Sequence, residues 1–126
     1  MKVRILKICL FICFPICSIA QQIVYSNVLK ENSRDMDFEI IGKINGNILV
    51  FKNQTSRYAV SIYKGEMELQ DKIDLDFIPP KAYNVDFVVY QNFFYLIYQY
   101  QKKGIVYCMA AKLDGNVKKL NEPIIL

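Results

Sequence analysis

The sequence predicts an all-β protein built from two consecutive four-stranded antiparallel meander sheets. From residue 38 onward, runs rich in β-branched and aromatic residues alternate with brief turn signals. No helical period of apolar residues interrupts these runs. A conspicuous linker at residues 74–84, which contains Pro79-Pro80, divides the runs into two groups, because proline cannot donate to a strand ladder.

The first repeat, residues 38–73, is expected to contain four strands. These strands are residues 38–44, 48–52, 58–63 and 67–73. Asn45-Gly46 predicts a tight hairpin between the first two strands, because both residue types tolerate a positive φ. A polar loop at 53–57 and a turn at Lys64-Gly65 connect the remaining strands. Strands that follow one another in the sequence are therefore expected to pair antiparallel.

The second repeat, residues 85–126, shows the same order of strands and turns. Its expected strands are residues 85–90, 93–100, 105–113 and 117–120. Tight turns are expected at 91–92 and 114–116, and a loop at 101–104 joins the second strand to the third. An offset of 45 residues places 48–51 on 93–96, so the sequence indicates a repeat of 45 to 50 residues.

Consecutive apolar positions in the inner strands predict burial on both faces. The runs are residues 48–51, 93–98 and 105–111. A strand with one wet face would alternate apolar and polar residues, whereas a continuous apolar run is typical of a sheet covered on both sides. The fourth strands differ, since 67–70 alternates and 117–120 is half lysine. That composition is typical of an outer edge strand, where lysines discourage edge pairing.

This pattern resembles a secreted bacterial β-propeller repeat protein with WD-like four-stranded blades. The resemblance covers residues 38–73 and 85–120, including the hairpin at 113–117, although the Gly-His and Trp-Asp dipeptides of WD repeats are absent. It implies that the chain is the N-terminal part of a longer propeller whose further blades are its partners, because two blades cannot close a ring. Residues 23–25 would then complete the last blade. A complete eight-stranded sandwich or barrel, and an oligomer that shares blades, are the alternatives.

The first twenty residues are typical of a secretory signal peptide. Three basic residues precede a short apolar run at 8–16, and small residues precede the cleavage expected between Ala20 and Gln21. The run is shorter than the roughly 20 residues that a transmembrane helix requires. The sequence therefore predicts export to the periplasm, the outer surface or the medium, with a lipid anchor as the alternative. Residues 21–37 are expected to form an N-terminal strand and a polar linker.

Charge and composition exclude several functional classes. The net charge of +4 falls to +1 without the first twenty residues, which argues against a nucleic-acid partner. The sequence contains no histidine, and Cys108 is the single cysteine after residue 20, so a Ser-His-Asp set, a Cys-His set and a zinc site are excluded. No cofactor is expected. The predicted function is non-catalytic binding or scaffolding, and the alternative is an N-terminal fragment of a propeller-type enzyme acting on glycans or peptides.

The candidate binding residues lie in or beside loops that a propeller topology would place at one end. Loops on a rigid scaffold are where binding residues concentrate. Tyr98 and Tyr100 are expected to offer ring faces near the loop at 101–104. The candidate residues are Asn53, Gln54, Arg57, Lys81, Tyr83, Tyr98, Tyr100 and Lys102. Amide donors, a guanidinium group and aromatic rings suit a protein, peptide or glycan ligand.

Overall fold

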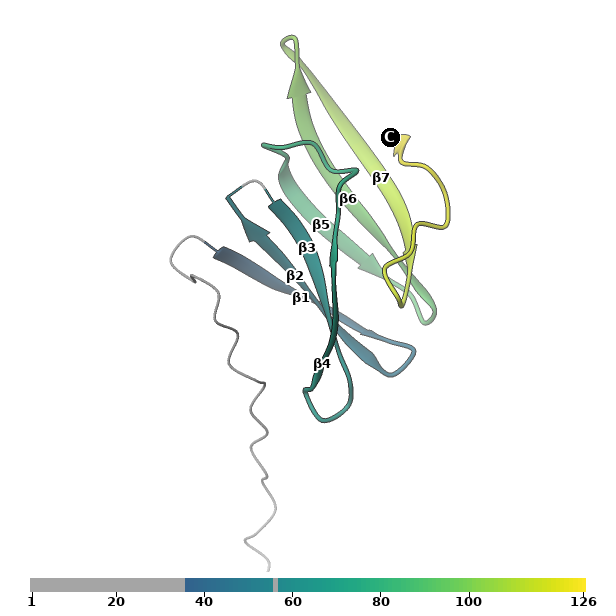
Figure 1. Cartoon of the computed structure of the whole chain (residues 1–126). Coiled ribbons are helices and arrows are strands. Elements are labelled where there is room, and N and C mark those ends of the chain that lie inside the picture. Colours follow the sequence, from purple (N-terminus) through teal and green to yellow (C-terminus); the bar gives the residue numbers. More distant parts are fainter. Residues whose placement is uncertain (1–35, 56) are drawn as a thin grey trace, which may run out of the picture.

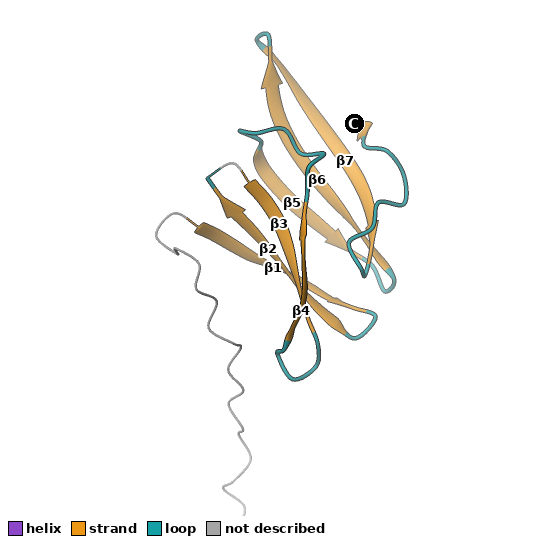
Figure 2. Cartoon of the chain, in the orientation of Figure 1, coloured by secondary structure: helices purple, strands orange, loops and turns teal. Residues whose placement is uncertain are grey.

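The structure is a computed structural model that describes residues 36–55 and 57–126. These residues form two four-stranded antiparallel sheets and contain no helix (Figure 2). The predicted all-β fold with two meander sheets is therefore confirmed. In both sheets the order of the strands in space follows their order in the chain, and the two sheets lie one behind the other (Figure 1).

The first sheet has the order β1-β2-β3-β4. Its strands are β1 (Met36–Ile44), β2 (Asn47–Gln54), β3 (Arg57–Tyr63) and β4 (Leu69–Asp74). The β1–β2 turn at Asn45 and Gly46 has positive φ angles of 50° and 86°, as a tight hairpin requires. Gly42 marks a bulge in β1 with a φ of 147°, and a Cβ there would lie 3.5 Å from Cγ1 of Val89. The two sheets therefore approach each other closely at this point.

The second sheet has the order β5-β6-β7-β8. Its strands are β5 (Tyr83–Val89), β6 (Phe93–Lys102), β7 (Ile105–Asp114) and β8 (Ile124–Ile125). β5 begins earlier than predicted because Tyr83 already pairs with Gln99. The linker between the sheets, residues 75–82, is correspondingly shorter than the predicted 74–84.

The predicted fourth strands are both corrected by the structure. Residues 117–120 form no strand, because Oδ1 of Asp114 accepts hydrogen bonds from the backbone N–H groups of Asn116 and Lys118, each at 2.9 Å. This side chain closes a local turn. After the turn, Lys119 forms only an isolated antiparallel bridge with Leu113, and a ladder with β7 forms again at β8. In the first sheet β4 starts at Leu69 rather than at Met67, because Met67 has a φ of 58° and donates its N–H to the Lys64 carbonyl.

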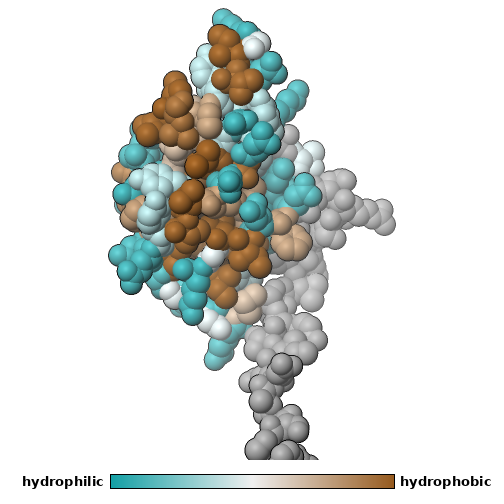
Figure 3. All heavy atoms as spheres, turned by 180° about the vertical axis from the view of Figure 1, so that it is seen from behind, coloured by the Kyte–Doolittle hydropathy of each residue, from teal (hydrophilic) through white to brown (hydrophobic). Residues whose placement is uncertain are grey.

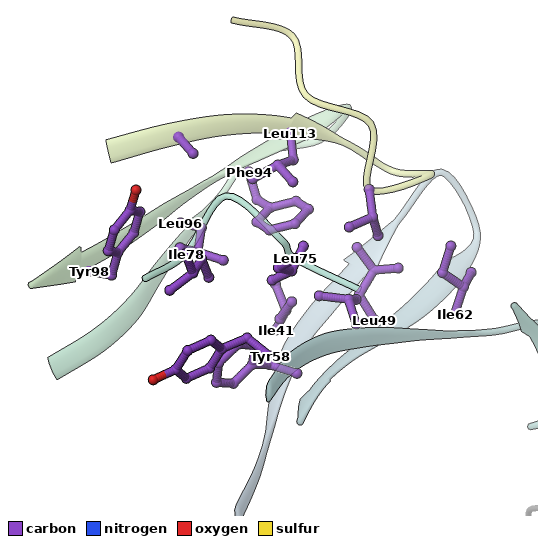
Figure 4. Close-up of a cluster of buried hydrophobic side chains, with 14 of the residues drawn as sticks. Ile41, Leu49, Tyr58, Ile62, Leu75, Ile78, Phe94, Leu96, Tyr98 and Leu113 are labelled. Atoms are coloured by element: carbon purple, nitrogen blue, oxygen red, sulfur yellow. The ribbon is translucent and has the colours of Figure 1, made fainter. Parts of the chain in front are cut away.

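Apolar side chains from both sheets meet in one core (Figure 4). Alternate residues of β3 and β6 supply much of it; these are Tyr58, Val60, Ile62, Phe94, Leu96 and Tyr98. Across the interface the rings of Phe51 and Phe87 have centroids 5.2 Å apart. Removal of this apolar surface from water is the main stabilising contribution to the pairing of the two sheets.

The linker closes one end of the core. Leu75 and Ile78 are buried, and the Leu75 N–H donates to the Tyr58 carbonyl at 2.8 Å. At the other end of the linker the Tyr58 hydroxyl donates to the Ala82 carbonyl at 3.0 Å. Tyr58 therefore anchors the linker to β3 at two points, which fixes the loop that surrounds the candidate site.

Burial on both faces, predicted for three apolar runs, is wrong for β2, β6 and β7. In β6, Phe94, Leu96 and Tyr98 are buried, whereas the alternate residues on the outer face are half-buried. One face of each sheet packs on the other sheet and the opposite face remains accessible. Figure 3, which views the molecule from the side of the second sheet, shows apolar side chains gathered on that surface. In β3, by contrast, every residue from Tyr58 to Tyr63 is buried.

Three predictions concern the N-terminal segment and lie outside the described residues. They are the signal peptide at 1–20, its cleavage between Ala20 and Gln21, and all but the last two residues of the strand and polar linker predicted at 21–37. Those two residues, 36 and 37, belong to β1 and not to a linker. β1 itself begins at Met36, two residues earlier than the predicted strand.

Candidate ligand-binding site

A row of three residues crosses the outer face of the first sheet next to the linker. Ala59 on β3 lies directly opposite Lys52 on β2 and Asp74 on β4. Residues that are opposite each other in an antiparallel ladder project to the same face. Since Val60, the next residue of β3, points into the core, Lys52, Ala59 and Asp74 project outward. The short methyl group of Ala59 leaves a depression between the two longer side chains.

This depression has a volume of about 200 Å³, and we call it the smaller hollow. Its lining residues are Lys52, Gln54, Arg57, Ala59, Lys72 and Asp74. Three of these carry a positive charge and one carries a negative charge, so the hollow is cationic. Lys52 is only 6% exposed, and it is the one charged side chain that is buried among the described residues.

A second depression adjoins the first and has a volume of about 340 Å³. We call it the larger hollow because it is the larger of these two adjoining depressions. Arg57 and Asp74 line both hollows. The other lining residues are Tyr58, Leu75, Asp76, Ile78 and Pro80. The larger hollow thus combines aliphatic surface from the linker with the carboxylates of Asp74 and Asp76.

A third depression, of about 450 Å³, separates the linker from residues 117–119. Phe77 forms part of its wall, and the Lys119 ammonium lies 5.5 Å from the Phe77 ring centroid. Lys119 also forms an ion pair with Glu122 at 3.0 Å. Because the Lys119 charge already has a partner within the protein, this depression offers less to a charged ligand than the smaller hollow does.

The three predicted site residues of the β2–β3 loop lie on two different faces of the first sheet. Gln54 and Arg57 project from the ends of β2 and β3 into the smaller hollow. Asn53 pairs with Tyr58, whose ring lies in the core, so Asn53 projects toward the opposite face of the sheet. It lines neither hollow.

The predicted aromatic residues form a stack rather than a flat platform. Tyr98 is 2% exposed, and its ring centroid lies 6.4 Å from those of both Phe77 and Tyr100. Tyr100 in turn stacks on Tyr107 at 5.2 Å. Burial raises the pKa of the Tyr98 hydroxyl above its ordinary value, with a further contribution from Tyr100. Tyr98 is therefore a core residue and presents no ring face to a ligand.

The remaining predicted residues do not line the hollows. Lys81 is exposed in the linker, Tyr83 is 39% exposed at the start of β5, and Lys102 is exposed at the tip of the β6–β7 hairpin. None of the three is among the lining residues of the depressions described above.

Sequence reasoning missed Lys52, Ala59, Lys72, Asp74 and Asp76 as site residues. Lys52 was expected only as the last residue of a strand, and the two aspartates only as part of a linker. One signal was available: Lys52 continues a strand whose preceding residues, 48–51, are all apolar. A charged residue at the end of an apolar strand, opposite a small residue on the neighbouring strand, indicates a polar position on an otherwise apolar sheet face.

Other common site types are not seen in the described part of the chain. Residues 36–55 and 57–126 contain no helix long and apolar enough to cross a bilayer and no group of three or more metal-ligating side chains. Cys108 is a free, half-buried cysteine on β7. Comparisons with protein-family models, with curated proteins and with solved structures found no match for this chain.

Proposed function

We propose that the chain is a non-catalytic binding module of an exported, β-propeller-like protein, and that its ligand is a protein, peptide or glycan. The observation that carries this proposal is the pair of adjoining hollows that share Arg57 and Asp74. They lie where two strands and the linker meet, so rigid elements hold the polar groups in place. Ligand sites commonly combine such fixed polar groups with an apolar wall.

Two features support the propeller-like part of the proposal. β1 and β5, the first strands of the two sheets, are in contact, as expected for blades that fan out from a common axis. The outer face of the second sheet carries exposed apolar residues such as Val88 and Ile124, which a further blade would cover. The export part rests on the sequence of residues 1–20, and N-terminal sequencing of protein recovered outside the cytoplasm should give Gln21 as the first residue.

Array binding tests the binding function. The purified protein, Arg57→Ala and Lys64→Ala would each be applied to a peptide array and a glycan array. Arg57 lines both hollows, whereas Lys64 is exposed in the β3–β4 turn at the opposite end of the sheet. We expect discrete signals from the unmodified protein that disappear with Arg57→Ala and persist with Lys64→Ala. Signals that are insensitive to Arg57→Ala, or no discrete signal on either array, would contradict the proposal.

A further inference from the structure

The outer face of the second sheet is apolar and accessible. Ile97 on β6 lies opposite Ala110 on β7, and Ala110 lies opposite Ile124 on β8. Since Leu96, the residue before Ile97, points into the core, this row projects outward. We use the name outer apolar face for the apolar residues that project to this side, which are Val88, Phe93, Tyr95, Ile97, Ala110 and Ile124. Apolar side chains gather on this surface (Figure 3), and such patches mark places where proteins associate.

The equivalent face of the first sheet is charged. Lys52 and Asp74 lie on either side of Ala59, and Lys72 lies opposite Ser61 in the next row. Stacking the outer apolar face on this surface would bury isoleucine side chains against charged groups. Pairing the outer apolar face with itself buries apolar surface on both sides, and a surface that pairs with itself does so about a two-fold axis. A second copy of this chain is therefore the occupant that fits this face.

The dimensions of the outer apolar face suffice for a reversible dimer. Four strands about 4.8 Å apart, with their side chains, make it about 20 Å wide, and the run from Phe93 to Gln101 makes it about 30 Å long. Two copies would together bury about 1,200 Å², which is the lower limit of the usual range for specific interfaces. We therefore expect an association that depends on protein concentration.

One acidic and one basic side chain stand on this apolar surface. Asp86 on β5 lies opposite Ile97 and therefore projects to the same side. Lys112 projects from β7, and its ammonium group lies 4.0 Å from the ring centroid of Phe93. In the described part of the chain, neither charge forms an ion pair. Both charges are therefore placed to interact across an interface at this face.

A two-fold axis that crosses the strands at Tyr95 brings these charges together. It exchanges the row of Phe93 with the row of Ile97, because these two residues lie on either side of Tyr95 along β6. Asp86 of one copy belongs to the Ile97 row and then lies over the Phe93 row of the other copy, one strand away from the Lys112 ammonium. One strand spacing is about 4.8 Å, which a lysine side chain can span. By symmetry the dimer contains two such ion pairs.

We propose that the outer apolar face joins two copies of this chain in a symmetric dimer, in which Asp86 of each copy faces Lys112 of the other. The sheet of the second copy covers Val88 and Ile124, as a further blade would. This interface goes beyond the proposed binding function, because the two hollows lie on the first sheet and take no part in it.

Sedimentation equilibrium of the purified protein tests the dimer. The protein would be measured from about 1 μM to about 1 mM, the range in which an interface of this area associates. Ile124→Lys places a charge in the outer apolar face. Ile40→Lys is the control, because it makes the same change on β1 of the first sheet, where Ile40 is 65% exposed. We expect the mass to double with concentration, Ile124→Lys to weaken association at least about tenfold, and Ile40→Lys to leave it unchanged.

Two outcomes of this measurement would contradict the proposal. A monomer at every concentration overturns the inference and leaves the binding function, which concerns the first sheet, untouched. An equal loss of association with Ile40→Lys would indicate head-to-tail stacking of the two outer faces, and would also overturn the symmetric dimer.

A charge exchange tests the position of the two-fold axis. Asp86→Lys and Lys112→Glu each place like charges together, and each should weaken association. Their equimolar mixture contains one original pair and one reversed pair, so it should recover association. Asp71→Lys is the matched control, because the Asp71 carboxylate accepts the N–H of the next residue at 2.8 Å, as the Asp86 carboxylate does at 2.7 Å. We expect this control to associate like the unmodified protein. Failure of the mixture to recover association would overturn the pairing of Asp86 with Lys112.

Discussion

The outer faces of the two sheets carry different chemistry at equivalent places. In the first sheet, Ala59 on the third strand lies between Lys52 and Asp74. In the second sheet, Ala110 on the third strand lies between Ile97 and Ile124. The two alanines are buried to the same degree, at 5% and 6% exposure. The scaffold therefore repeats, while the flanking residues change from two charged groups to two isoleucines.

This difference separates what the fold needs from what a site needs. On the second sheet, isoleucines beside the alanine extend an apolar surface, although Ile124 remains 53% exposed. On the first sheet, the charged pair reduces the apolar surface that the strand can bury, and the Lys52 side chain is only 6% exposed. Polar groups that lower stability without serving the packing are common at functional sites. The Lys52–Ala59–Asp74 row is therefore the better candidate for a ligand, and the Ile97–Ala110–Ile124 row for packing.

The largest expected effect concerns the inner faces, where the two sheets should behave alike. Leu49→Ala and Leu96→Ala each remove a fully buried side chain and leave a cavity, so each should lower the free energy of unfolding by about 2–5 kcal/mol. Denaturant unfolding of both variants measures this. A loss below about 1 kcal/mol in one sheet alone would indicate that the core is not shared equally.

Exchanging the outer rows should have opposite effects in the two sheets. Ile97→Lys places a charge in an apolar row and should lower the free energy of unfolding by about 1–2 kcal/mol. Lys52→Ile places an apolar side chain at a position that is only 6% exposed and should raise the same free energy by about 1 kcal/mol. The same denaturant experiment measures both changes. If both variants are destabilised equally, the two rows play the same structural role.

Alkaline pH should act on the inner face through Tyr98. Because burial raises the pKa of this hydroxyl in the folded protein, the unfolded chain loses the proton first as the pH rises. The stabilisation from Tyr98 is thus complete below about pH 10, the ordinary tyrosine pKa, and is lost above it. Melting curves from pH 7 to pH 11 should show a smaller alkaline decrease for Tyr98→Phe than for Tyr95→Phe, which keeps Tyr98. Equal decreases would argue against a buried hydroxyl.

The smallest expected effect is at the surface of the second sheet. Glu122→Gln breaks the exposed ion pair with Lys119 and should change the free energy of unfolding by less than about 1 kcal/mol. Raising the salt concentration should reduce even that difference. A larger loss would mean that the segment between β7 and β8 contributes more to the fold than its exposure indicates.

The sequence predicted the features of this fold that depend on local signals. The order of strands, the division at Pro79-Pro80 and the tight turn at Asn45-Gly46 follow from residue types that act within a few positions of the chain. The fourth strand of the second sheet was wrongly predicted at residues 117–120. The Asp114 side chain accepts hydrogen bonds that close a turn there, and the residue types at 117–120 do not reveal this turn. The strand that takes this place in the sheet, Ile124-Ile125, is defined by its pairing with β7, which is distant in the sequence.

The candidate site was only partly predictable for a related reason. Gln54 and Arg57 were found because they flank a polar loop, which the sequence shows directly. Lys52 and Asp74 become neighbours only through the register of β2, β3 and β4, and register is set by long-range packing. Tyr98 was misjudged for the opposite reason: its place near a loop did not reveal that the inner face of β6 buries its ring.

Enlarging the side chains of the two equivalent alanines tests the central claim most directly. Ala59→Leu and Ala110→Leu introduce the same side chain on the third strand of each sheet, and the binding of each variant to the peptides or glycans identified on the arrays would be measured by calorimetric titration. We predict that Ala59→Leu weakens binding by at least about tenfold, because the added side chain occupies the hollow between Lys52 and Asp74. Ala110→Leu should leave the affinity unchanged. Equal affinity in both variants, or a loss caused by Ala110→Leu alone, would contradict the assignment of the site to the first sheet.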